Sequence, residues 1–345
     1  MKQNNYLLNF LKVTFFSLLL IATSPVRAEI KVVTTIKPLH SLIANVMDGV
    51  GEPSLIIEGS TSPHSFTLKP SHAKLLEEAD LIFWVGEGIE TFMERPLESI
   101  VKNAEVVEFM EIESIEKLKF REESIYGDHD DHDDHDDDHD DHDDHDDHDE
   151  DHDDHDDHDD HDDHDDHDDH AGHEGHNHGE FDAHIWLDPS NAKEMVHEIA
   201  HELGDLDPAN KDKYEANAEA TIIALDQLIE DVSKDINKDA KFVVFHDAYQ
   251  YFEERFGVRA AGALTLNTDV LPGAKQIDEI QDVIKDRGIN CIFSEPQFNP
   301  KIISTIAEDT NIKTGVFDPL GANINSDKDL YFKLISNLGN ELKGC

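Results

Sequence analysis

Basic residues, cysteines and long apolar runs are all scarce in this sequence of 345 residues. It has 28 lysines and arginines against 79 acidic residues, and a formal net charge of -51. The shortage of basic side chains argues against nucleic-acid binding, because neutralisation of phosphate by Lys and Arg supplies most of that affinity. It also argues against an anionic membrane surface. The acidic excess instead suits a protein that handles cations.

The N-terminus lacks an apolar run long enough to span a membrane. Its mostly apolar stretch, residues 13–22, is about half the length of a spanning helix, which needs roughly 20 residues. Lys2, the apolar residues that follow it and the small residues before Glu29 are typical of an export signal. We expect a signal peptide at residues 1–28, cleaved before Glu29, and a soluble mature protein in an oxidising compartment. No cysteine lies near the cut, which excludes a lipoprotein; an uncleaved membrane anchor is the alternative.

The two cysteines are Cys291 and Cys345, the last residue of the chain. Export favours a disulfide between them, because an exposed free thiol would oxidise outside the cytoplasm. Such a bridge would close a long loop and contribute about 4 kcal/mol in the chain-entropy model. Two unrelated thiols are the alternative.

Residues 128–178 form a His/Asp-rich insertion that repeats His-Asp-Asp almost without interruption. No apolar residue lies between positions 128 and 169, so no buried surface offsets the roughly 1–2 kcal/mol of backbone entropy that each ordered residue loses. We therefore expect this insertion to be disordered. Imidazole suits zinc, copper, nickel and iron, and carboxylates attract cations, so the repeat predicts many weak metal sites. An acidic solubility tail is the alternative, but such a tail needs no histidine.

The predicted low-affinity ligands of the insertion are its histidines: His129, His132, His135, His139, His142, His145, His148, His152, His155, His158, His161, His164, His167, His170, His173, His176 and His178.

Outside the insertion, short apolar runs alternate with helical patterns, which is typical of parallel sheets covered by helices on both faces. Strands are predicted at residues 31–36, 54–57, 81–85, 105–110, 242–245, 291–294 and 314–317. Helices are predicted at residues 39–50, 70–78, 91–101, 191–203, 211–236, 248–256, 273–287, 300–309 and 330–342.

The predicted helix over residues 211–236 is the longest, with apolar residues spaced by three or four along its whole length. It would be about 39 Å long, enough to connect two domains. The sequence therefore predicts an α/β protein of two βα lobes with parallel sheets, joined by one long rigid helix, with a metal cleft between the lobes. We expect an N-terminal lobe at residues 29–208 that contains the insertion, a linking helix at 209–237 and a C-terminal lobe at 238–345.

Four polar segments follow apolar runs, at the places where open α/β sheets bind ligands. They contain His64, His184, His246 and Asp318. Any one histidine in such a place is more often a core or capping residue, but four segments at equivalent places in two lobes indicate a shared site. Neutral imidazole suits tetrahedral zinc, whereas manganese prefers oxygen ligands. Copper and nickel also bind imidazole.

These segments, their order, the long helix and the insertion between the first two histidines resemble the metal-specific solute-binding proteins of bacterial ABC importers, in particular their zinc-binding branch. The resemblance covers essentially the whole mature chain. It implies that His64, His184 and His246 bind Zn²⁺ between the lobes. Asp318 stands at a fourth ligand position, where zinc members can use water or another carboxylate. Pro63 precedes His64 where some zinc members have Glu, so no ligand is carried over there.

The same resemblance assigns further properties. The related manganese carriers have a carboxylate at the position of His246, which makes this histidine the expected specificity residue. The family's C-terminal cysteine pair matches Cys291 and Cys345. The chain would be a periplasmic monomer, with no nucleic-acid partner, that delivers zinc to an inner-membrane ABC permease.

Two other functions compete with zinc delivery. A periplasmic zinc buffer or metallochaperone without a permease would need only the insertion, not a two-lobed body. A zinc metalloprotease is suggested by His197, Glu198 and His201, which match the H-E-x-x-H signature. These side chains fall on the polar side of a predicted helix with no pocket implied, so we expect no enzyme.

Overall fold

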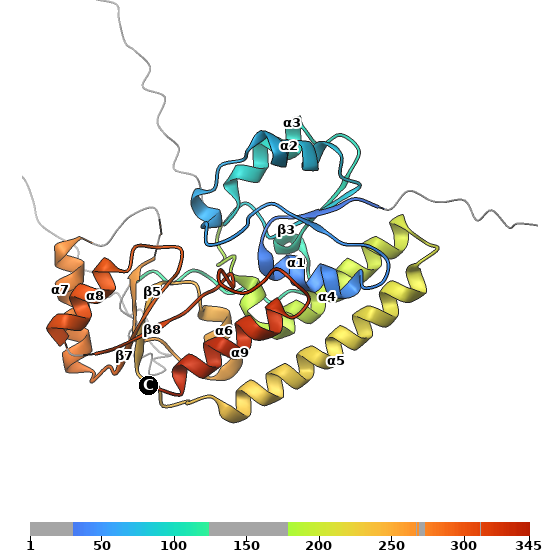
Figure 1. Cartoon of the computed structure of the whole chain (residues 1–345). Helices are drawn as coiled ribbons and strands as arrows, with labels where there is room; N and C mark the ends of the chain where they lie inside the picture. The colour runs from blue at the N-terminus through green and yellow to red at the C-terminus, as the bar shows by residue number, and fades with distance from the viewer. Residues whose placement is uncertain (1–29, 124–178, 267, 269–272, 311) are drawn as a thin grey trace, which may run out of the picture.

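The structure is a computed structural model that describes residues 30–123, 179–266, 268, 273–310 and 312–345 (Figure 1). The predicted signal peptide and the insertion of residues 128–178 lie outside the described residues. Within the part of the chain that is described, no helix is both long and apolar enough to cross a bilayer.

The first sheet is parallel, with strand order β2-β1-β3-β4. Each residue of β3, Leu81 to Trp84, is buried, as expected for a parallel strand with both faces covered. The elements of this lobe are β1 (Val32–Thr34), α1 (Lys37–Val46), β2 (Ser54–Leu55), α2 (Pro70–Glu77), β3 (Leu81–Trp84), α3 (Glu94–Ser99) and β4 (Glu105–Glu108).

The second sheet repeats this arrangement with the order β6-β5-β7-β8, again parallel. In both sheets the strand order reverses beside the first strand, so the loops after the first and third strands open a crevice at the carboxyl edge. Its elements are β5 (Phe242–His246), α6 (Gln250–Phe256), β6 (Ala263–Thr265), α7 (Ala274–Asp286), β7 (Cys291–Ser294), α8 (Lys301–Thr310), β8 (Lys313–Val316) and α9 (Leu330–Leu342).

Helices α4 (Pro189–Leu206) and α5 (Lys211–Asp235) connect the two lobes. Figure 1 shows α5 running along the outside of the molecule from the first lobe to the start of the second, with α1, α4 and α9 beside it. One apolar cluster includes Leu42 of α1, Leu225 of α5 and Leu338 of α9, so these helices share a core. The predicted two parallel sheets and long helix are confirmed; the lobe boundaries proposed at residues 208 and 238 stay a prediction.

Polar contacts also hold the first lobe against the second. The buried ammonium group of Lys37 donates hydrogen bonds to the carbonyls of Gly321 (2.5 Å), Ala322 (3.1 Å) and Ile324 (2.6 Å). Desolvation lowers the pKa of Lys37, although the charge of Asp318 opposes the shift. The loop that follows β8 is therefore fixed to the first helix of the other lobe.

The predicted disulfide between Cys291 and Cys345 is confirmed. It ties the end of the chain, three residues beyond α9, to the first residue of β7. The bridge therefore fastens α9 to the second sheet at its amino edge, away from the carboxyl edge where the histidines lie.

Several predicted elements differ from the structure. Strand β6 was not predicted, because three residues are too few to show a periodic pattern. The single helix predicted at residues 91–101 is a 3-10 turn, Thr91–Met93, followed by the short α3. Pro96 in the first turn of α3 lacks the N–H that a helix continuing from the turn would use.

Candidate metal centre

His246 is the last residue of β5, and the sheet register determines which side chain faces it. Residues 242 and 243 pair with residues 291 and 292 of β7, and the same register continued to the strand ends places Glu295 opposite His246. The Nδ1 atom of His246 lies 2.7 Å from Oε1 of Glu295. Both side chains are buried. Glu295 therefore orients the imidazole ring and fixes the proton on Nδ1.

His184 has a similar carboxylate, supplied by its own segment. Asp182 Oδ1 accepts a hydrogen bond from the backbone N–H of His184 (3.0 Å) and lies 2.6 Å from its Nδ1. His184 immediately precedes the 3-10 turn Ile185–Leu187, and its side chain is buried. Burial raises the pKa of Asp182 to about 7, while the hydrogen bond from His184 opposes that shift.

His64 comes from the first lobe, where it is the central residue of the 3-10 turn Pro63–Ser65 between β2 and α2. Proline at the first turn position suits this geometry because its φ is already near the helical value. The imidazole centroid of His64 lies 5.6 Å from that of His184 and 5.9 Å from that of His246. Within the described ranges, these three histidines are the one group whose ligand atoms could hold a metal, all within 4.8 Å of one another.

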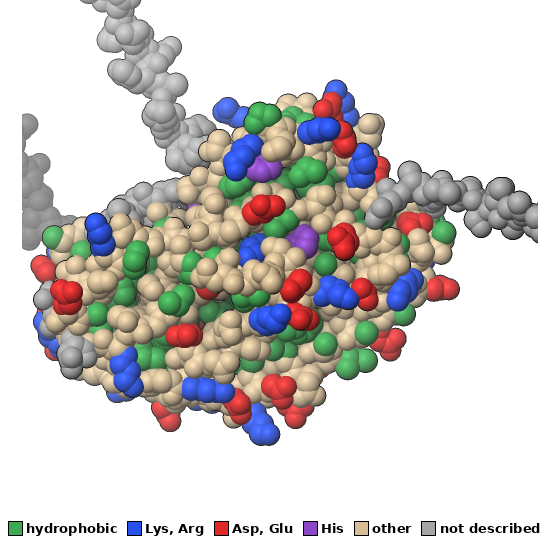
Figure 2. Space-filling view, viewed as in Figure 1, with side chains coloured by type: hydrophobic (Ala, Val, Ile, Leu, Met, Phe, Trp, Pro, Cys, Tyr) green, Lys and Arg blue, Asp and Glu red, His purple; other side chains and the backbone are tan. Residues whose placement is uncertain are grey.

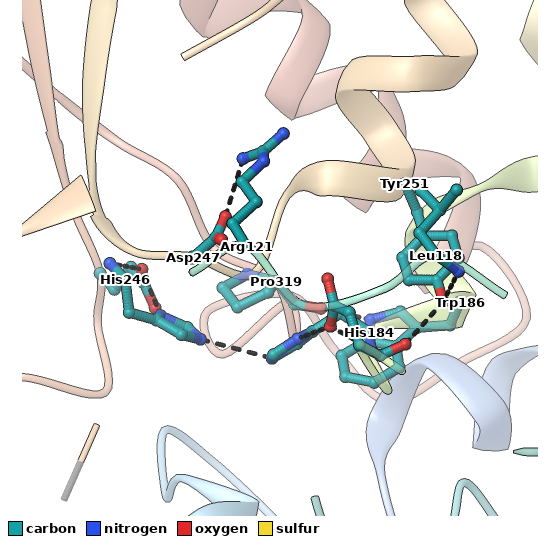
Figure 3. A network of polar contacts seen from close by, with 10 residues as sticks. Leu118, Arg121, His184, Trp186, His246, Asp247, Tyr251 and Pro319 are labelled. Carbon is teal, nitrogen blue, oxygen red and sulfur yellow. Dashed lines mark hydrogen bonds and ion pairs between the residues drawn. The ribbon is translucent and has the colours of Figure 1, made fainter. Parts of the chain in front are cut away.

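The distance between two ring nitrogens indicates what the group binds. Nε2 of His184 lies 3.3 Å from Nε2 of His246, and both Nδ1 atoms face carboxylates (Figure 3). When each Nδ1 carries the proton, both Nε2 atoms present lone pairs, which repel each other unless a proton or a metal cation lies between them. Two nitrogens on a tetrahedral zinc with bonds of 2.0–2.1 Å are separated by about 3.3–3.4 Å.

The protonation of the two rings differs. Burial lowers the pKa of His184 well below its ordinary value, and the neighbouring His246 adds to the effect. Burial also lowers the pKa of His246, but the negative charges of Glu295, Asp247 and Asp182 together raise it above its ordinary value. His184 is therefore neutral at physiological pH, which is the form that binds metal.

The surroundings of the three histidines are mostly apolar. The small cavity they share is also lined by Ile89, Trp186, Phe298, Pro319 and Leu320, among others. Apolar walls exclude water and weaken charge screening, which strengthens the attraction between a bound cation and its ligands.

The family model for zinc-uptake complex component A, periplasmic (ZnuA), matches residues 32–345. The chain belongs to this family. It is 49% identical over 316 residues to the high-affinity zinc uptake system protein ZnuA of Brucella abortus strain 2308, covering 91% of each chain. It is 34% identical over 332 residues to the protein of that name from Yersinia pestis, covering 95% of each chain.

The fold agrees with membership of the ZnuA family. A crystal structure of ZnuA superposes with a TM-score of 0.66 at 20% identity, covering 90% of this chain and 98% of that one. The predicted family of zinc-transporting solute-binding proteins, located in the periplasm, is therefore confirmed. ZnuA proteins are transport components, not enzymes.

The H-E-x-x-H motif of this ZnuA family chain lies on the outside of α4. His197 and His201 are exposed, and Nδ1 of His201 is 3.5 Å from Asp205 Oδ2 one turn later. Glu198 is half-buried between them. These side chains are not part of the metal-capable group found in the described residues. The motif is therefore a solvent-facing stretch of helix, as its periodicity predicted.

Asp318 is not part of the metal-capable group found among the described residues, although its partners Gln297 and Leu320 line the same cavity as the three histidines. Its Oδ1 accepts hydrogen bonds from Nε2 of Gln297 (3.1 Å) and from the backbone N–H of Leu320 (3.3 Å). The predicted role of Asp318 as the fourth ligand stays a prediction.

Sequence reasoning missed the carboxylates that orient two of the histidines, Asp182 and Glu295. One signal for Glu295 was present: it directly follows a buried strand, as the candidate ligands do.

Proposed function

We propose that this chain captures zinc in the periplasm with His64, His184 and His246 as ligands, and delivers it to the inner-membrane permease of an ABC importer. The observation that supports this most is the 3.3 Å separation of two Nε2 atoms whose Nδ1 atoms both face carboxylates. Three imidazoles favour zinc over manganese, and a carboxylate from Asp318 or a water molecule would complete a tetrahedron.

The insertion of residues 128–178 would collect zinc at low affinity and raise its concentration near the site. The described residues that flank it support this role. Lys119 and Phe181 form an antiparallel bridge, so the described segments before and after the insertion lie side by side. Phe120 and Arg121 line a cavity that His64, His184 and His246 also line. Ions released beside these flanking residues would therefore be close to the site.

The proposal also includes the division into lobes and the oligomeric state. The lobes would comprise residues 29–208 and 238–345, linked by residues 209–237, and the chain would act as a monomer. Figure 2 shows acidic and basic side chains interspersed over one face, without a large area of one sign. One largely buried site, in the part of the chain that the structure describes, suits delivery to a permease better than buffering, for which the insertion alone would suffice.

Deletion of residues 128–178 tests the division between tight and weak zinc binding. Zinc titrations of the full chain and of the deletion variant, each in competition with a chromophoric chelator, should show one tight ion per chain in both proteins. The full chain alone should bind additional weak ions. Loss of the tight ion in the deletion variant would place the tight site in the insertion.

Substitution of single ligands tests the assignment. His64→Ala, His184→Ala and His246→Ala should each lose tight zinc binding while the circular dichroism spectrum and cooperative unfolding persist. His197→Ala is the matched control, because this exposed histidine should not affect zinc affinity. For the permease, zinc-loaded protein should stimulate the ATPase activity of the reconstituted transporter more than the His246→Ala variant does.

A further inference from the structure

The segment that carries His184 is hydrogen-bonded to the second lobe, although it precedes α4 and α5 in the chain. The hydroxyl of Tyr251, on α6, donates to the carbonyl of Asp182 (2.6 Å) and accepts from the backbone N–H of Leu118 (2.9 Å). Tyr251 and Asp182 are both buried. One tyrosine of the second lobe therefore fastens the backbone two residues before His184, and Figure 3 shows Tyr251 beside Leu118 close to this segment.

The residues after His184 are fastened in the same way. The indole Nε1 of Trp186 donates to the carbonyl of Pro319 (2.8 Å), and the hydroxyl of Tyr331 donates to the carbonyl of Trp186 (2.7 Å). Arg255 forms two 2.7 Å hydrogen bonds with the carboxylate of Asp188, which caps α4. His184 is thus held on both sides by side chains and backbone that belong to residues 251–331.

His64 is held differently. The last strand-like hydrogen bond before it joins Ile57 N–H to the Thr35 carbonyl (2.9 Å). Residues 58–61 are exposed, whereas Ser62 and Pro63, directly before His64, are buried. The backbone–backbone hydrogen bond described for the turn, from Phe66 N–H to the Pro63 carbonyl, is long at 3.4 Å. An exposed stretch such as residues 58–61 reorganises at lower free energy than a buried segment that is hydrogen-bonded to the other lobe.

We infer that His184 and His246 form a preassembled pair of ligands fixed to the second lobe, with Tyr251 as a positioning residue, and that His64 is the ligand that joins last. This inference rests on the proposed function, because it assigns an order to the three proposed ligands. The pair already has the nitrogen separation of a tetrahedral site, so an arriving zinc ion binds two imidazoles without reorganisation, and binding then orders the loop of His64.

Three variants that keep the same number of ligands should then differ in zinc affinity. Each single His→Ala substitution leaves two imidazoles. If the three ligands were equivalent, the three variants would bind zinc equally. With a preassembled pair, His64→Ala keeps two correctly placed ligands, whereas His184→Ala and His246→Ala each keep one fixed ligand and one on the loop. Fixing the backbone of even one further residue of that loop costs conformational entropy that lowers zinc affinity by about tenfold.

Zinc affinities of the three full-length variants, measured against chelators that span a range of zinc affinity, provide the test. We expect His64→Ala to bind at least about tenfold more tightly than either other variant. Equal losses in all three would overturn the preassembled pair and leave the ligand assignment intact. Wild-type affinity in all three would instead overturn the ligand assignment, so the two failures are distinguishable.

Tyr251→Phe tests the positioning role, with Tyr214→Phe as the matched control. Tyr214 is a buried tyrosine on α5 whose hydroxyl donates to Asp207 (3.3 Å), away from the triad. Both variants should lose a similar amount of stability in urea, but only Tyr251→Phe should weaken zinc binding, by several-fold. Tyr251→Phe should weaken zinc binding by the same factor when it is added to His64→Ala, because Tyr251 positions the pair of His184 and His246. Unchanged affinity in Tyr251→Phe, or equal weakening by both substitutions, would refute the role.

Discussion

Replacing Glu295 by Gln separates the charge of the carboxylate from its geometry. The carboxylate lies 2.7 Å from Nδ1 of His246 and also accepts the backbone N–H of that residue at 3.2 Å. A glutamine oxygen can accept the same hydrogen bonds, so the orientation of the ring should persist. What the variant loses is the negative charge that makes His246 a stronger zinc ligand.

The size of the effect follows from the distances. The imidazole ring separates the carboxylate from a zinc ion on Nε2, which places the two about 6–7 Å apart. At an effective dielectric constant of about 20, a divalent cation and one carboxylate attract each other by roughly 5 kcal/mol at that distance, as an upper limit. Solvation of the free site offsets part of this, and loss of such outer carboxylates costs about 10- to 100-fold in metal affinity. We expect Glu295→Gln to lie in that range.

The loss of zinc affinity in Glu295→Gln should also depend on pH. Burial alone would lower the pKa of His246, and Glu295 is the largest of the charges that raise it, so protons compete with zinc for wild-type His246 as the pH falls through that raised value. The substitution lowers the pKa of His246 and moves this competition to lower pH. The loss of affinity in the variant should therefore be largest near pH 8 and should shrink toward about pH 5.

Competition titrations across this pH range, on full-length wild type and variant, would measure the effect. The insertion contributes the same weak sites to both proteins. Glu90→Gln serves as the control, because Glu90 is a similarly buried carboxyl in the first lobe that accepts hydrogen bonds from the backbone N–H groups of Val85 and Gly86. The difference in zinc affinity between wild type and Glu295→Gln should shrink on acidification. A difference that stays constant or widens would show that Glu295 does not act through the charge state of His246.

Three further predictions concern stability, and urea unfolding measures each. Replacing Cys291 and Cys345 by Ser should lower the free energy of unfolding by about 2–4 kcal/mol without changing zinc affinity, since the bridge lies at the opposite edge of the sheet; a change in affinity would contradict this. Lys37→Met should cost about 1–3 kcal/mol, because three carbonyls between the lobes lose their donor; an unchanged midpoint would contradict it. Burial raises the pKa of Glu90 from 4.5 to about 7, so the folded state binds the proton more tightly and wild-type stability falls as the pH rises from about 4.5 to 7. Glu90→Gln should gain about 2–3 kcal/mol over wild type near pH 8 and little near pH 4, and parallel pH profiles would refute this.

Local patterns in the sequence determined the main elements of the fold. The spacing of apolar residues predicted α5, which the structure places at Lys211–Asp235, and the strand β7 at Cys291–Ser294. The disulfide followed from having two cysteines in an exported chain. These features depend on short-range periodicity or on covalent chemistry, so no knowledge of neighbouring elements was needed.

The same local patterns did not predict short elements correctly. Strand β6, Ala263–Thr265, exists because its residues pair with the edge of β5, and three residues carry no periodic signal of their own. The helix predicted at residues 91–101 divides because a proline lies where it would have continued. In both places a contact or a local steric conflict outweighs the average pattern.

The polar segments beyond apolar runs, together with the family resemblance, predicted His64, His184 and His246 as ligands; the structure brings the three together, and their role as ligands stays a prediction. Only the tertiary structure decided which side chains hold them. Glu295 is 49 residues from His246, and it faces that ring because β7 pairs with β5 in one register. Tyr251 reaches the segment of His184 because α6 packs beside its 3-10 turn. Such partners depend on strand order, register and helix packing, which arise from the whole core and which no local stretch of sequence specifies.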